Sequence, residues 1–235
     1  PDFYDVPIKQ ILSKEYSKDL AYQIGGMRTP DGQIYEGDLK KYDESPDTTH
    51  FSVIDSKGNA VSNTYTLGSS FGSGVTIKKG GFLMNNQMRN FSHFYGRDDM
   101  EYGTSEANKL EPGKRMISTQ TPTLVFNPNG DLFMILGSPG GGRIPNIITQ
   151  VISNVIDHEM SFTEAVIAPR INQRLEGNLQ LETGFSPDTI SLLIDRGHEV
   201  ESSNTMGSVQ AIFLDQGKIF GVADTRRPGA LAKGN

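Results

Sequence analysis

The stretch THFSVIDSKGNAVSNTY at residues 49–65 decides the fold class of this sequence. Phe51 and Val53 indicate one strand, and residues 60–65 indicate a second. Ser-Lys-Gly-Asn at residues 56–59, between the two strands, has the composition of a hairpin turn. The sequence therefore predicts a β-hairpin that begins directly after Thr48.

Two more strand pairs follow the same pattern further along the chain. Each pair consists of two apolar runs around a turn rich in Asn, Asp or Gly, and a short strand candidate also lies at residues 82–84. The two pairs are residues 123–126 with 132–136, around the turn at 127–130, and residues 210–214 with 219–223, around the turn at 215–217.

Helical segments lie between and before these hairpins. Residues 144–156 carry Pro145 in the first turn and an apolar stripe along one face. Ser161-x-x-Glu164 is a capping box, Ser186-Pro187-Asp188 opens another helix that Gly197 should stop, and residues 8–20 have helical spacing with Ser13 as a cap. Hairpins, then helices, then hairpins again predict an antiparallel sheet covered by helices.

Composition excludes several classes of protein. The 235 residues include 22 basic and 28 acidic ones, a net charge of −6, with no basic run that would suit nucleic acid. No apolar stretch approaches the length of a membrane span. With no cysteine, disulfides and thiolate metal sites are impossible. Because Pro1 stands where a start methionine is expected and no signal peptide follows, we expect a processed or trimmed chain.

The glycine-rich run Gly137–Arg143, between an apolar strand and an apolar helix, has two readings. It lacks the Lys-Ser/Thr ending of a phosphate loop and the following acid of a dinucleotide site. Glycine amides in such a run can form an oxyanion hole, because no side chain blocks their approach to a developing negative charge. A tight strand-to-helix turn is the simpler reading of the run by itself.

Other polar residues offer weaker candidates. The four histidines stand apart, without metal-ligand spacing, so no metal site is expected. Asn85-Asn86-Gln87, after an apolar strand, would suit either a polar ligand or a turn. Thr48-Thr49 joins the polar, unpatterned segment of residues 27–47 to the first hairpin. A threonine at such a junction becomes an effective nucleophile if the preceding peptide bond breaks, because its new α-amine can act as the base.

Taken together, these features resemble the γ-glutamyltranspeptidase family of N-terminal-nucleophile hydrolases. The matching blocks cover essentially the whole chain in family order. They include residues 2–7, 42–53, 64–67, 71–74, 85–88, 112–116, 137–141, 168–170, 184–189 and 206–208.

The resemblance implies a precursor that cuts itself between Asp47 and Thr48. Residues 1–47 would be the C-terminal tail of a large subunit, most of which lies outside this sequence, and residues 48–235 would be the small catalytic subunit. The implied fold is α+β, a four-layer αββα sandwich. The implied partners are the protein's own large subunit, as a heterodimer, and a small γ-glutamyl substrate such as glutathione, with no nucleic acid or membrane.

The family's site residues carry over by position. The resemblance makes Thr48 the nucleophile, Thr66 the residue that orients it, and Gly140 and Gly141 the oxyanion hole, which now favours that reading of the glycine run. It places Gln87 near the donor's α-amine, Ser118 and Thr119 at its α-carboxylate, and Tyr102-Gly103 in a lid loop. No cofactor is implied, because nucleophile and base share one residue.

Three positions depart from the family. Gly68 replaces a common Asn and Asn90 a common Asp, both of which help to bind the donor's α-ammonium, and Arg89 replaces a second common acid. Loss of a charge-assisted hydrogen bond there would cost about 1.5–3 kcal/mol if the bond is buried.

These departures leave three functions open. The first is a γ-glutamyltransferase or glutathione hydrolase. The second is a glutaryl-type (cephalosporin) acylase with the same chemistry, and the third is a non-catalytic binding relative. Since bacterial relatives are usually exported, the resemblance also implies a periplasmic or secreted protein.

Overall fold

The structure is a computed structural model, and it describes Phe3, Gln33 and residues 5–30, 48–92, 106–173 and 177–234. The chain divides into two compact units. One contains residues 1–41, 90–117 and 171–203, and the other contains residues 42–89, 118–170 and 204–235. The second unit carries all three predicted hairpins.

Strands β1 (Thr49–Ile54) and β2 (Ala60–Tyr65) form the first hairpin. They pair antiparallel from Thr49 opposite Tyr65 to Ile54 opposite Ala60. Gly58, in the turn, has φ 82°, a left-handed conformation that glycine adopts at little cost. The predicted hairpin is confirmed.

A four-stranded antiparallel sheet in the order β11-β10-β6-β5 contains the other two hairpins. Its strands are β5 (Thr123–Phe126), β6 (Leu132–Gly137), β10 (Gln210–Asp215) and β11 (Lys218–Ala223). Both pairs agree with the prediction. The short strands β3 (Thr76–Ile77) and β4 (Phe82–Leu83) make a separate hairpin in the same unit.

Helices cover one face of this sheet. Helix α3 (Ile144–Ile156) starts with Pro145 in its first turn and buries the predicted stripe from Ile144 to Val151, whereas Ile156 at its end is exposed. Helix α4 (Phe162–Ile167) starts with the predicted capping box at Ser161. The two helices and the sheet enclose one apolar core. Its buried residues are Met134, Leu136, Ile144, Ile147, Ile148, Val151, Ala165, Val166, Met206, Val209, Ala211 and Phe213.

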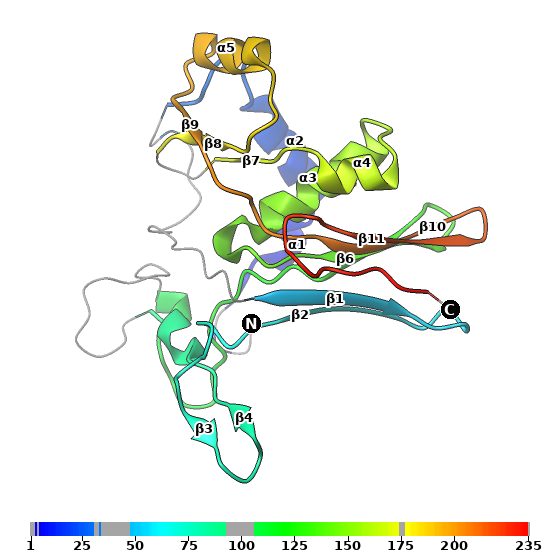
Figure 1. Cartoon of the computed structure of the whole chain (residues 1–235). Coiled ribbons are helices and arrows are strands. Elements are labelled where there is room, and N and C mark those ends of the chain that lie inside the picture. The colour runs from blue at the N-terminus through cyan, green and yellow to red at the C-terminus, as the bar shows by residue number, and fades with distance from the viewer. Residues whose placement is uncertain are drawn as a thin grey trace. The chain divides into compact units, whose positions relative to one another are not determined.

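The β1–β2 hairpin packs on the other face of the same sheet, against β6 and β10 (Figure 1). This contact is polar. The Ser52 hydroxyl lies 3.3 Å from the carbonyl oxygen of Ile135 and 3.0 Å from that of Gln210, and the Ser62 hydroxyl donates to the Leu136 carbonyl at 2.9 Å. Hydrogen bonds to the backbone therefore link the strand that follows Thr48 to the central sheet.

The first unit contains α1 (Ile8–Ile11), α2 (Lys14–Tyr22), α5 (Pro187–Asp195) and a three-stranded sheet of β7 (Ile171–Asn172), β8 (Leu179–Leu181) and β9 (Val200–Ser202). Ser13 caps α2 and Ser186 caps α5, as predicted. The parallel pairing of β8 with β9 was not predicted. Strands of two or three residues are too short for a recognisable alternation. No helix among the described residues is long and apolar enough to span a bilayer.

Candidate active site

Thr48 lies immediately before β1 and is only 4% exposed. Its carbonyl oxygen accepts a 2.7 Å hydrogen bond from Nη1 of Arg227. Continuing the β1–β2 register by one pair places Thr48 opposite Thr66, just beyond the last paired residues, Thr49 and Tyr65. The hairpin thus brings together the two threonines that the sequence analysis singled out.

The contacts between the hairpin and the sheet show which end of the sheet Thr48 meets. Ser52 lies over Ile135, and the His50 ring lies against Gly137, the last residue of β6. A step of two residues back along β1, from Ser52 to His50, therefore corresponds to a step of two residues forward along β6, from Ile135 to Gly137. The next step places Thr48 at the carboxyl end of β6, where the glycine-rich run begins.

That run forms a tight turn into α3. Gly140 has φ 139° and Gly141 has φ 53°, both in the region that favours glycine. A β-carbon on Gly140 would lie 3.0 Å from Cδ1 of Ile147, so the core beneath leaves no room for a side chain. The run is a strand-to-helix turn, and its two glycines adopt backbone conformations that residues with a side chain rarely take.

Hydrogen bonds hold the turn from both sides. Ser138 Oγ donates to the Pro139 carbonyl at 2.6 Å and accepts from the Ser208 amide at 3.0 Å. Thr119 Oγ1 donates to the Gly141 carbonyl at 3.0 Å. Thr119, a predicted substrate residue, is therefore placed beside the predicted oxyanion hole, while the neighbouring Ser118 is exposed.

Thr66 opens a short loop that Asn86 supports. Thr66 Oγ1 accepts from the Gly68 amide at 2.9 Å, and the Asn86 side chain bonds both the amide and the hydroxyl of Ser69, at 3.0 and 2.9 Å. Gly68 is buried with φ 95°. A β-carbon there would overlap Asn86 Oδ1 and would lie 3.5 Å from Nε2 of Gln87, so Gln87 borders the same loop.

The remaining two predicted substrate residues are Asn90 and Tyr102. Asn90 is buried in the other unit, where its carbonyl accepts from Asn108 Nδ2 at 2.7 Å. Tyr102 lies outside the described residues, as does Asp47 before the expected cleavage point.

Neither the burial of His50 nor two arginine contacts is predicted from the sequence. His50 was treated as an isolated histidine, but it is buried among hydroxyls between the sheets, and burial lowers its pKa to about 4. Arg227 was not singled out at all. Arg170, in a matched sequence block, is buried in a 2.7 Å ion pair with Asp224. Burial alone would raise the pKa of Asp224, but the charge of Arg170 and several hydrogen bonds outweigh burial and lower it.

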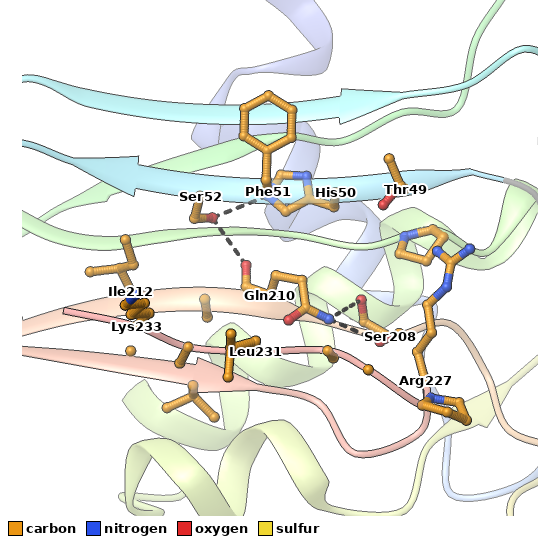
Figure 2. A pocket seen from close by; sticks show the side chains of 18 residues that line it. Thr49, His50, Phe51, Ser52, Ser208, Gln210, Ile212, Arg227, Leu231 and Lys233 are labelled. Atoms are coloured by element: carbon orange, nitrogen blue, oxygen red, sulfur yellow. Dashed lines mark hydrogen bonds between the residues drawn. The ribbon is translucent and has the colours of Figure 1, made fainter.

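A cleft of about 460 Å³ lies beside this cluster, between β1 and the C-terminal segment that contains Arg227, Leu231 and Lys233. Figure 2 shows the Ser52 hydroxyl bonded to both His50 and the Gln210 carbonyl, while the Phe51 ring points away from Gln210. Of the predicted substrate residues that the structure describes in this unit, Gly68, Gln87, Ser118 and Thr119 do not line the cleft. Within the described residues, no group of three His, Asp or Glu side chains is arranged to hold a metal ion.

Comparisons with known proteins identify the family to which this fold and site belong. The family model of gamma-glutamyltranspeptidase matches residues 1–234, and the chain belongs to this family. A glutathione hydrolase proenzyme of Escherichia coli is 41% identical over 239 residues, which are 100% of this chain and 41% of that protein.

Solved structures give the same result. The gamma-glutamyltranspeptidase from Pseudomonas nitroreducens in complex with L-DON is 37% identical with a TM-score of 0.70, covering 80% of this chain and 100% of that one. A cephalosporin acylase from Bacillus halodurans is 27% identical with a TM-score of 0.78, covering 100% of this chain and 41% of that one. The mixed α/β fold matches these enzymes. The chain spans about two fifths of the length of the curated relatives it matches.

Proposed function

We propose that this chain is the C-terminal part of a γ-glutamyltransferase proenzyme that cleaves itself before Thr48. The mature enzyme would transfer the γ-glutamyl group of glutathione-like donors to water or to an amino acid. The observation that carries the proposal is the position of Thr48, which is buried at the start of β1, opposite Thr66 by register and at the end of β6 that leads into Gly140 and Gly141.

The proposed chemistry needs only these residues. The Thr48 hydroxyl attacks the γ-amide carbonyl carbon, and the Thr48 α-amine takes the hydroxyl proton. The amides of Gly140 and Gly141 stabilise the oxyanion, the C–N bond breaks, and the departing amine takes the proton. Water or an amino acid then attacks the γ-glutamyl ester on Thr48 and releases the enzyme. No cofactor enters this cycle.

Family relatives support the proposed cleavage point. Residues 48–235 are 188 of the 235 residues, or 80% of the chain. The Pseudomonas nitroreducens chain is covered completely by the same fraction of this one. That is the match expected if the solved chain is a separate small subunit.

Exposed apolar surface supports a large-subunit partner. Four apolar side chains lie on the outward face of the β1–β2 hairpin, beside Thr49 and Asn63: Phe51, Val53, Val61 and Tyr65 are 46–58% exposed. In the other unit, Leu12 and Leu20 at the N-terminal helices are also exposed. A contiguous apolar sheet face is typical of an interface. We propose that the rest of the proenzyme covers it, adding the fourth layer of an αββα sandwich to the three that the 48–235 segment supplies.

A glutaryl-type acylase is the second candidate, and Gly68 and Asn90 are the observations that favour it. A γ-glutamyl donor carries an α-ammonium, which a glutaryl donor lacks. Gly68 has no side chain to accept from that group, and Asn90 lacks the negative charge of the Asp common in the family. Rates on γ-glutamyl and glutaryl anilides would distinguish the two enzymes. Export to the periplasm or the medium is also part of the proposal, and it is supported only by the resemblance to the family.

Intact-mass analysis of the full-length protein tests the proposal, with wild type beside Thr48→Ala. We expect two fragments from the wild type, the smaller beginning at Thr48, and one uncut chain from the variant. An uncut wild type under maturing conditions would leave Thr48 without a free amine. That result would exclude both the γ-glutamyltransferase and the acylase hypotheses and would favour a non-catalytic binding relative.

A further inference from the structure

His50 occupies a hydroxyl-lined position between the β1–β2 hairpin and the four-stranded sheet. Its Nδ1 lies 2.8 Å from Thr64 Oγ1, and its Nε2 lies 3.1 Å from Ser52 Oγ. Two main-chain carbonyls lie within reach of the Ser52 hydroxyl, that of Gln210 at 3.0 Å and that of Ile135 at 3.3 Å, so we assign its one hydrogen to a carbonyl. Ser52 therefore accepts from His50, which assigns the proton to Nε2 and makes Nδ1 the acceptor from Thr64. A single neutral imidazole ring can therefore make the hydrogen bonds to both Thr64 and Ser52.

The same ring packs on the backbone at the end of β6. A β-carbon on Gly137 would lie 2.8 Å from His50 Nε2 and closer still to Cε1 and Nδ1. The φ of Gly137 is not in the left-handed region, so its backbone would accept any residue. Glycine is needed at this position to leave room for the ring, and this makes His50 and Gly137 a matched pair.

The pair connects the two halves of the proposed active site. His50 is two residues after Thr48 on β1, and Gly137 is three residues before Gly140. Strands rise about 3.3 Å per residue, so His50 lies about 7 Å along the chain from Thr48, and Gly137 lies three and four residues before Gly140 and Gly141. An oxyanion hole requires its donors within a few tenths of an ångström of their place. A spacer at this point controls the distance between nucleophile and amides.

We propose that His50 is a positioning residue, whose ring, seated on Gly137, fixes the distance between Thr48 and the amides of Gly140 and Gly141. The inference rests on the function proposed above. His50 itself does not touch the substrate or transfer a proton in this scheme. We therefore expect a substitution of His50 to change the rate of acyl transfer rather than donor binding, because the predicted donor residues Gln87, Ser118 and Thr119 lie on other segments.

The test uses the full-length proenzyme with His50→Ala, His50→Asn, Gly137→Ala and the double variant His50→Ala/Gly137→Ala. Activity is referred to the cleaved fraction measured by intact mass. We expect His50→Ala to lower kcat about 10- to 100-fold with KM within about 2-fold, because a displacement near 1 Å has that effect on a reaction rate. His50→Asn keeps an acceptor for Thr64 and should recover part of the loss. The exposed His158→Ala is the matched control and should change nothing.

The double variant gives the most decisive comparison, the effect of Gly137→Ala with and without the His50 ring. Gly137→Ala alone should lower kcat to a similar extent, because its methyl group displaces the ring. In the His50→Ala background the same methyl group has room, so it should add less than about 2-fold.

Equal effects of Gly137→Ala with and without His50 would overturn the inference. So would a folded His50→Ala enzyme with unchanged kcat, or one that changes only KM. If His50→Ala does not fold, Gly137→Ala and His50→Asn still decide between these outcomes. A Thr48→Ala variant that is still cleaved and active would instead refute the proposed function.

Discussion

The guanidinium of Arg227 donates a 2.7 Å hydrogen bond to the main-chain carbonyl of Thr48, joining residues 179 positions apart in the sequence. Thr48 is buried, so this carbonyl has little access to water. The C-terminal segment therefore helps to hold the residue that the proposed mechanism makes the nucleophile.

Replacing Arg227 with Ala should slow self-cleavage and lower stability. The variant leaves a buried carbonyl unpaired, at a cost of about 1–3 kcal/mol. Thermal unfolding and the time course of cleavage would both be measured, with Lys233→Ala, an exposed change in the same segment, as the control. Cleavage at the wild-type rate in a folded Arg227→Ala protein would show that this hydrogen bond does not position Thr48.

Gly140→Ala should reduce both stability and kcat. A side chain at φ 139° costs roughly 1–3 kcal/mol, and its β-carbon would lie 3.0 Å from Ile147 Cδ1. Ile147→Val in the same background relieves only the contact, so it should recover part of the stability. Wild-type kcat in Gly140→Ala would argue against a role for this amide in the oxyanion hole.

Acid should destabilise the protein through His50. Burial lowers the pKa of His50 to about 4 from 6.5, so between these pH values the unfolded chain binds a proton that the folded chain does not. Stability therefore falls as pH decreases from 6.5 to 4, by up to about 3 kcal/mol at 1.36 kcal/mol per pH unit.

Urea unfolding at pH 7, 5.5 and 4.5 measures this loss. His50→Asn has no ring to protonate, so its stability should decline less over that interval. The lowered pKa of Asp224 acts in the same direction, but only as pH falls below about 3.8, outside the range measured. Parallel pH curves for wild type and His50→Asn would contradict the prediction.

Donor preference should respond differently at the two altered positions. Asn90→Asp restores an anionic acceptor and should favour γ-glutamyl over glutaryl anilides, by about 10-fold if a charge-assisted hydrogen bond returns. Gly68→Asn should not do the same, because Gly68 has φ 95° and its β-carbon would overlap Asn86 Oδ1. It should lower stability instead. The ratio of kcat/KM on the two anilides checks both changes. A gain with Gly68→Asn alone would show that Asn86 can move aside.

Local patterns in the sequence determined much of the unit that contains Thr48. Turn residues around apolar runs identified all three of its larger hairpins, and Ser161 identified the start of α4, as Ser186 identified the start of α5 in the other unit. Turns and caps can be recognised in this way because they are set by interactions a few residues apart. Thr48, Thr66 and the glycine pair could also be proposed from the sequence, since they stand in blocks that match the family.

Only the tertiary structure revealed what holds these residues in place. The contacts of Arg227 with Thr48, of His50 with Gly137 and of Arg170 with Asp224 join segments 54 to 179 residues apart. The parallel pairing of β8 and β9 likewise depends on a crossover through α5. Such contacts leave no periodicity in the chain, because packing of distant segments, rather than the order of neighbouring residues, decides which side chain is buried against which backbone.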